Sequence, residues 1–97
     1  MFIKLTNCLE DEDNSYKFGD MEYYIPIKSI VKMFSYKEDE DNNFYMDERT
    51  EYYCLGIERF DGNDTNLEVY YFPKKEDRDA VIEQIVTHPV FVESFNK

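Results

Sequence analysis

The sequence predicts a small α+β protein, in which an antiparallel, strongly bent β-sheet of about five strands (β-β-β-β-β-α) is covered by one C-terminal helix. Apolar and polar residues alternate over several short stretches before residue 73, which is the period of a β-strand. After that point the spacing changes to one helix face, carried by Val81, Ile82, Ile85 and Val86. Ninety-seven residues suit a single domain, 1–97, and 42% hydrophobic residues can fill its core.

The N-terminal half is expected to hold three strands and one acidic loop. Residues 2–5 are short and apolar and predict the first strand. Residues 8–20 are acidic and carry Asn-Ser and Gly-Asp pairs, which are typical of a loop. Residues 21–27 alternate, and Pro26 places that strand at an edge or a bulge because proline cannot donate to a ladder. Residues 29–36 predict a further strand that is partly apolar on both faces, which indicates a twisted or curved sheet covered on both sides.

The C-terminal half is expected to hold a second acidic loop, a hairpin and the helix. The second loop covers about residues 37–50, and the longest strand follows over 51–60. The Asp-Gly-Asn-Asp sequence at 61–64 predicts a hairpin turn into a strand over 67–72. The helix is expected at about 75–88, with acidic residues in its first turn and His-Pro at its end.

The net charge of −11 is concentrated in the middle of the chain. Residues 10–64 hold 16 acids and 6 bases (−10), whereas residues 1–9 carry +1 and residues 65–97 carry 6 acids and 4 bases (−2). Such a charge argues against direct binding of nucleic acid or of an anionic membrane. An EDEDN sequence occurs twice within this middle segment. Its eight acids are Glu10, Asp11, Glu12, Asp13, Glu38, Asp39, Glu40 and Asp41.

Tyrosine pairs accompany the acids. If the stretches around residues 24, 52 and 70 are strands, each Tyr-Tyr pair places one ring inward and one outward. The members expected to face outward are Tyr24, Tyr52 and Tyr70. Tyrosine is common in binding hot spots, although strands favour aromatic residues in any case.

No catalytic, metal or cofactor site is expected. His88 precedes a proline at a helix end, and Cys8 and Cys54 lie in an acidic chain without a CxxC pattern. The residues from Asp61 begin like a calcium loop but depart from it, with Asn66 at the glycine position. Without a visible export signal or membrane span, the expected location is the cytoplasm, with both thiols reduced.

These observations predict a non-enzymatic protein that binds a basic protein, such as a nuclease or another nucleic-acid-binding protein. Rows of carboxylates can imitate phosphates, and aromatic rings can occupy base-stacking positions. In composition the chain resembles small acidic phage-encoded inhibitors of host nucleases or defence systems, including nucleic-acid mimics. That resemblance implies action in a host cytoplasm. The alternative is a small-ligand-binding protein or oligomeric scaffold that uses the exposed tyrosines. The sequence leaves the oligomeric state open.

Overall fold

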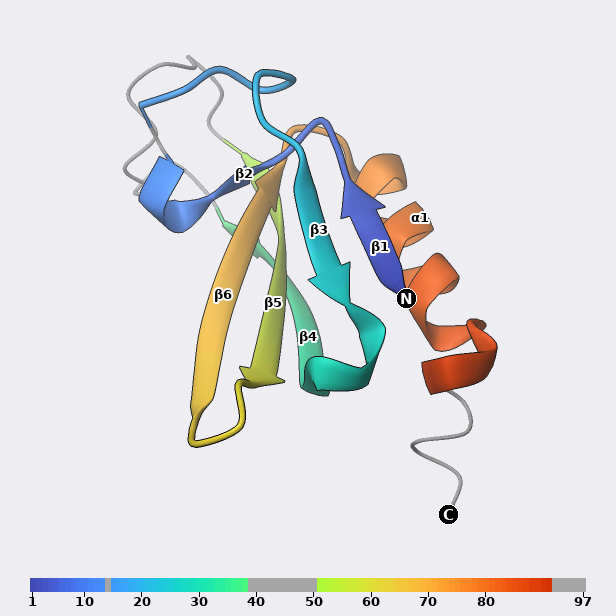
Figure 1. The fold of residues 1–97 in the computed structure, drawn as a ribbon. Helices are drawn as coiled ribbons and strands as arrows, with labels where there is room; N and C mark the ends of the chain where they lie inside the picture. The colour runs from blue at the N-terminus through green and yellow to red at the C-terminus, as the bar shows by residue number, and fades with distance from the viewer. Residues whose placement is uncertain (14, 39–50, 92–97) are drawn as a thin grey trace.

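The computed structural model describes residues 1–13, 15–38 and 51–91, and it confirms the α+β class (Figure 1). The described residues form six strands, one main helix and two short 3-10 helices. Their bounds are β1 Phe2–Leu5, β2 Leu9–Glu10, η1 Asp11–Asp13, β3 Tyr23–Pro26, η2 Ile27–Ser29, β4 Ile30–Glu38, β5 Tyr52–Phe60, β6 Thr65–Phe72 and α1 Lys75–Val86.

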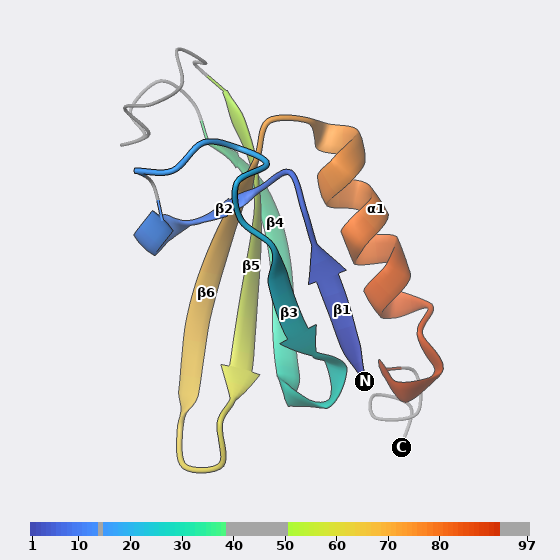
Figure 2. The ribbon, with the colours of Figure 1, turned by 45° about the horizontal axis from the view of Figure 1, so that its top comes forward.

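The strands divide into two antiparallel sheets. One contains β1 and β3, and the other has the order β2-β6-β5-β4. Figure 2 shows the β1–β3 pair beside α1, in front of the larger sheet. The loop predicted over residues 8–20 is therefore only partly irregular, because Leu9 and Glu10 pair with Tyr71 and Tyr70 of β6. This pairing joins distant parts of the chain, so local turn signals do not reveal it.

The β5–β6 hairpin closes through the turn predicted at 61–64. The carboxylate of Asp61 accepts hydrogen bonds from the backbone N–H groups of Asn63 and Asp64, both at 3.0 Å. The Nδ2 group of Asn66 donates to the other Asp61 oxygen at 2.8 Å. Gly62 has φ +103°, a conformation that residues with side chains rarely adopt. The Asp61 oxygens thus organise the turn itself.

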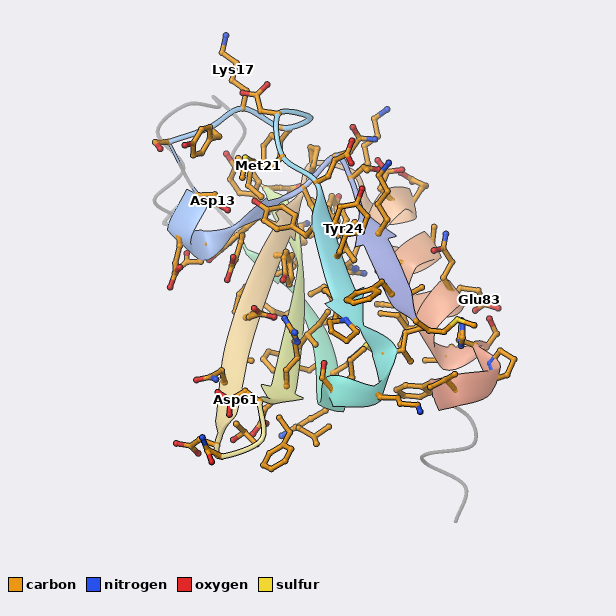
Figure 3. All side chains as sticks on the ribbon, viewed as in Figure 1. Asp13, Lys17, Met21, Tyr24, Asp61 and Glu83 are labelled. Atoms are coloured by element: carbon orange, nitrogen blue, oxygen red, sulfur yellow. The ribbon has the colours of Figure 1, made fainter. Side chains whose placement is uncertain are left out.

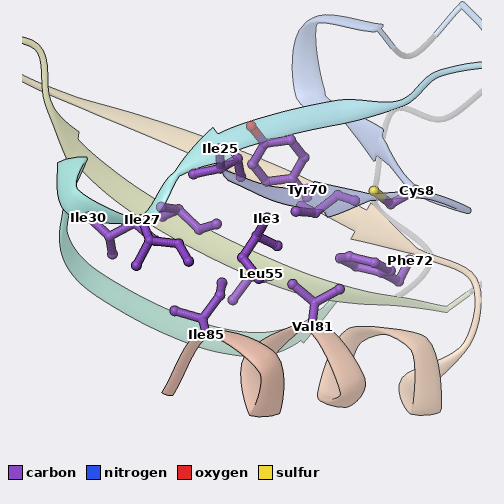
Figure 4. Close-up of a cluster of buried hydrophobic side chains, with 12 residues drawn as sticks. Ile3, Cys8, Ile25, Ile27, Ile30, Leu55, Tyr70, Phe72, Val81 and Ile85 are labelled. Carbon is purple, nitrogen blue, oxygen red and sulfur yellow. The ribbon is translucent and has the colours of Figure 1, made fainter. Parts of the chain in front are cut away.

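The main core lies between the larger sheet and the layer formed by β1, β3 and α1 (Figure 4). Each fully buried aliphatic side chain stabilises the fold by about 1.5–3 kcal/mol relative to an exposed one. The buried members of the main core are Ile3, Leu5, Cys8, Ile25, Ile27, Ile30, Leu55, Ile57, Tyr70, Phe72, Val81 and Ile85.

A second core lies on the opposite face of the same sheet. It contains Leu9, Tyr52, Cys54 and Tyr71, and Phe18, Met21 and Val69 pack against it. The first half of β5 is consequently buried on both faces. The two-sided cover expected from the sequence is found, but on β5 rather than on β4.

Arg78 joins α1 to the larger sheet. Its side chain is buried, with the guanidinium 5.7 Å from the centre of the Tyr53 ring. Nη1 donates to the backbone oxygen of Tyr36 at 3.2 Å, and Nε donates to Asp79 at 3.0 Å. The contacts with Tyr36 and Tyr53 link α1 to β4 and β5, so Arg78 helps to position α1 on the sheet.

Candidate protein-binding surface

The first acidic run lies in a connection that we call the acidic loop, residues 10–22. It contains six acids and one base, Lys17, for a net charge of −5. The loop leaves β2 at Glu10, turns through η1 and returns to β3 at one end of the molecule. Figure 3 shows Asp13, Lys17 and Met21 there, with the Asp61 turn at the opposite end. Its exposed carboxylates are those of Asp11, Glu12, Asp20 and Glu22.

Apolar side chains hold the acidic loop against the sheet. Phe18 and Met21 pack on the second core, and the Phe18 ring centre lies 5.8 Å from that of Tyr52. Between them the chain turns, with the Lys17 N–H donating to Asp20 Oδ2 at 3.1 Å and the Asp20 N–H donating to the Lys17 oxygen. The exposed acids are therefore carried by a loop with its own packing contacts.

On the main-core side of the sheet, Tyr23 holds the start of the acidic loop through two hydrogen bonds. Its hydroxyl donates to Asp13 Oδ2 at 2.7 Å and accepts a hydrogen bond from the Glu10 N–H at 3.0 Å. The ring packs edge-on against Tyr70, with centres 5.2 Å apart. Burial, the first cause, and the nearby Asp13 carboxylate raise the pKa of Tyr23, so the hydroxyl remains a donor at neutral pH.

Glu10 is the acid whose environment differs most from that of a solvated loop. It is half-buried and pairs with Tyr70 across the β2–β6 ladder. Burial and then the charge of Glu68 raise the pKa of Glu10 to about 7, while Arg59 acts in the opposite sense. Glu68 is itself held by Arg59, whose Nη1 lies 3.0 and 3.2 Å from its two carboxylate oxygens. The raised pKa of Glu10 was not expected from the sequence, because β2 was not predicted.

Of the three tyrosines expected to face outward, only Tyr24 does so. It is 57% exposed, and its hydroxyl donates to Glu22 Oε2 at 2.9 Å. The prediction for Tyr52 and Tyr70 is wrong, since they are 0% and 2% exposed. The predicted alternation of side chains between the two faces of each strand is correct, but both faces are covered. Phe18 packs on Tyr52, and Tyr23 packs on Tyr70. Tyr16, which was not predicted as a surface residue, is 48% exposed within the acidic loop.

The second acidic run begins at the other edge of the larger sheet. Glu38 ends β4 and pairs with Tyr52, whereas residues 39–41, with Asp39, Glu40 and Asp41, lie outside the described residues. The order β2-β6-β5-β4 separates β2 from β4 by three strand spacings, about 14 Å. Glu10 and Glu38 thus lie on strands at opposite edges of the sheet.

Cys8, Cys54 and His88, the residues considered for catalysis, are buried or hydrogen-bonded within the fold. Cys8 and Cys54 are buried free thiols, and burial followed by the charge of Asp77 raises the pKa of Cys8 to about 12. His88 Nδ1 accepts a hydrogen bond from the Val90 N–H at 3.1 Å, just beyond α1. Among the described residues, no group of three or more His, Cys, Asp or Glu side chains could hold a metal ion.

A small pocket lies between the β1–β2 connection and α1. Its volume of about 140 Å³ corresponds to about four or five water molecules, well below the size of usual ligand sites. Its lining residues are Lys4, Thr6, Asn7, Asp77, Ala80, Val81 and Gln84. Lys4 is also paired with Glu22, with Nζ and Oε2 3.3 Å apart.

The chain matches no protein-family model, no curated protein and no solved structure. Across the described ranges, none of the helices has the length and apolar character needed to cross a bilayer. The candidate surface combines the exposed acids and Tyr16 of the anchored acidic loop with the exposed Tyr24 of β3.

Proposed function

We propose that the protein is a non-enzymatic, acidic protein-binding inhibitor whose acidic loop docks on a basic, nucleic-acid-binding surface of a partner protein. The partner would be a nuclease or another nucleic-acid-binding protein, as in phage-type anti-defence proteins and nucleic-acid mimics acting in a host cytoplasm. The observation that carries this proposal is the set of exposed carboxylates on a loop fixed by Phe18 and Met21.

The anchoring of the loop supports a binding role. A flexible acidic segment would lose conformational entropy on docking, whereas a loop already packed on the sheet loses less. Tyr16 and Tyr24 add exposed rings beside the carboxylates, and tyrosine buries contact area at low entropic cost. Complementary charge then increases the association rate and makes the affinity depend on salt.

The alternative of a small-ligand-binding protein or tyrosine-lined scaffold has less support. Two of its three tyrosines, Tyr52 and Tyr70, lie in the cores and cannot contact a ligand or partner. Beside α1, the pocket lined by described residues has room for only a few water molecules.

The test is binding by a variant with a neutralised loop. Immobilised protein would first capture a basic partner from a lysate, and the purified partner would then be titrated at about 50 mM and about 500 mM NaCl. The triple variant Asp11→Asn, Glu12→Gln, Asp20→Asn should weaken the Kd about tenfold or more at low salt. Added nucleic acid should compete with the wild-type protein for the partner.

The matched control removes three exposed acids elsewhere, through Asp64→Asn, Glu76→Gln and Glu83→Gln. Its overall charge equals that of the loop variant, so it should retain most of the affinity. Equal weakening by both variants would assign binding to net charge alone. Affinity that is unchanged at high salt, or a partner that keeps its nucleic acid, would refute the inhibitor proposal.

A further inference from the structure

The outer edge of β6 is only partly covered, because β2 is much shorter than β6. β2 lies opposite Tyr70 and Tyr71, and η1 then turns the chain away. Within the described ranges, no strand lies opposite residues 65–68 on this side. Figures 1 and 2 show this stretch of β6 at the side of the molecule. The sheet therefore has a short open edge in line with β2, and such edges are templates for pairing with another strand.

The hydrogen bonds of the β5–β6 hairpin show which backbone groups point to this edge. The Asp61 N–H donates to the Asp64 oxygen at 3.0 Å, so these two residues form a hydrogen-bonded pair. Such pairs alternate along an antiparallel ladder, and the β5–β6 register has no break, so Asn66 and Glu68 also point toward β5. Leu67 lies between them and directs its N–H and C=O groups to the outer edge.

We propose that this edge binds an extended segment of the basic partner protein, antiparallel to β6 and in line with β2. The segment carries a lysine or arginine opposite Glu68 and apolar residues opposite Leu67 and Thr65. The inference rests on the proposed function for the basic character of the partner, but it adds a second contact on β6. In this mode of recognition, backbone hydrogen bonds supply affinity and the alternating side chains supply specificity.

The charges around Glu68 fit a basic residue. The Glu68 side chain is 24% exposed, and its carboxylate is held by Arg59. Glu10 lies on the same face of the sheet, because it pairs with Tyr70, two residues from Glu68. Burial and then the charge of Glu68 raise the pKa of Glu10 to about 7, so the single guanidinium of Arg59 does not compensate both carboxylates. A cation opposite Glu68 would lie two positions beyond Glu10 on this face and supply the missing charge.

The other face of the sheet is apolar and exposed beside this edge. Leu67 is 56% exposed, and Phe60, which pairs with Thr65, is 50% exposed. Side chains opposite Leu67 and Thr65 would join this face, because residues paired across two strands point to the same side of a sheet. Valine or isoleucine at these two positions suits the pleated surface.

A second copy of the chain does not fit the edge as well as a basic segment does. Each copy has a net charge of −11, and residues 65–72 contain Glu68 but no lysine or arginine. Two β6 edges paired with each other would bring acidic groups together without an added cation. Charge complementarity therefore favours the basic partner as the occupant.

The probe is the synthetic peptide acetyl-Arg-Val-Thr-Val-Thr-amide, titrated into the isotope-labelled full chain and followed by NMR. The Leu67 amide should shift, and a peptide with glutamate in place of arginine should bind about tenfold more weakly. Net charge alone also favours the arginine peptide, so two N-methylated peptides of equal charge decide. Methylating the first valine removes the N–H that faces the Leu67 oxygen, and should abolish binding. Methylating the first threonine, whose N–H faces solvent, should change the Kd less than about twofold.

Glu68→Gln tests the charge on the protein side, and Glu76→Gln is its matched control. Both variants remove one acid, but Glu76 is exposed on α1, away from this edge. Glu68→Gln should weaken binding of the arginine peptide about fivefold or more, whereas Glu76→Gln should change the Kd less than about twofold. Circular dichroism would establish that each variant is folded.

The proposal is overturned if the Leu67 amide does not shift at about 5 mM peptide, or if the two N-methylated peptides bind equally. Protection of this amide that grows with protein concentration alone would assign the edge to a second copy and overturn it as well. The proposed function can fail separately. If the neutralised loop variant keeps its partner while the two methylated peptides still differ, the loop docking is wrong and the edge site stands.

Discussion

Glu10 shows how one residue can belong to both the fold and the acidic surface. Its N–H is held by Tyr23, and its carboxyl lies near that of Glu68. The pKa of Glu10 in the folded protein is raised from 4.5 to about 7. The folded chain therefore binds this proton more tightly than the unfolded chain does. Its contribution to stability is largest at low pH and is lost as the pH rises from about 4.5 through 7.

The prediction at this scale is that Glu10→Gln stabilises the protein at pH 8 and changes little at pH 5. The gain should be about 1 kcal/mol or less, because Glu10 is only half-buried and solvent screens its charge. Urea unfolding at the two pH values measures it. Glu12→Gln, which removes the same charge from an exposed position of the same loop, is the control. An equal gain from both variants would show that overall charge, and not the surroundings of Glu10, is responsible.

At the scale of elements, the local patterns predict most of the strands and the helix. The strand at 2–5, the hairpin turn at 61–64 and the helix face carried by Val81 and Ile85 all follow from short-range periodicity or turn chemistry. The division into two sheets does not follow from these local patterns. β1 pairs with β3, whereas β2, the next strand, pairs with β6 far along the chain. No local rule identifies that partner.

The candidate surface was predicted less completely than the fold. Alternation groups Tyr52 with Cys54 and Tyr70 with Phe72, but it does not tell which face another segment will cover. Phe18 and Met21 cover the face of Tyr52, and they lie in a stretch whose composition is typical of a solvated loop, whereas Tyr23 packs on the face of Tyr70. The sequence did contain one signal that this loop packs on the sheet, namely the apolar residues Phe18 and Met21 among its acids.

The prediction for this element is that Phe18→Ala loosens the acidic loop without changing its charge. Removing part of a half-buried ring should lower the free energy of unfolding by about 1–2 kcal/mol. Trypsin should cleave faster after Lys17, which is exposed in this loop. Tyr16→Ala, which removes an exposed ring from the same loop, should leave the cleavage rate nearly unchanged. Equal cleavage rates for Phe18→Ala and the wild-type protein would show that Phe18 does not anchor the loop.

At the scale of the whole molecule, the net charge of −11 opposes the compact state. The exposed ion pairs Lys4–Glu22 and Lys37–Glu51 offset little of this repulsion, because each is half-exposed and screened by water. Stability should therefore depend on the ionic strength of the solution.

We expect the Tm to rise by a few degrees between about 20 mM and about 500 mM NaCl at neutral pH, since salt screens repulsion among the carboxylates. Calorimetry or thermal circular dichroism measures the shift. Repeating the series near pH 4, where many carboxylates are protonated, should give a smaller shift. A Tm that falls with salt at neutral pH would mean that attractive ion pairs outweigh the repulsion.

The pairing of Leu9 with Tyr71 has a consequence for the order in which the chain can fold during synthesis. The β4–β5 and β5–β6 pairs join neighbouring strands and can form early, whereas β2 must wait until β6 has left the ribosome. Ile3 and Leu5 wait longer, because they share the main core with Val81 and Ile85 of α1. β1 and β2 are thus translated before the elements that bury them, and until then their apolar side chains remain open to chaperones and to aggregation.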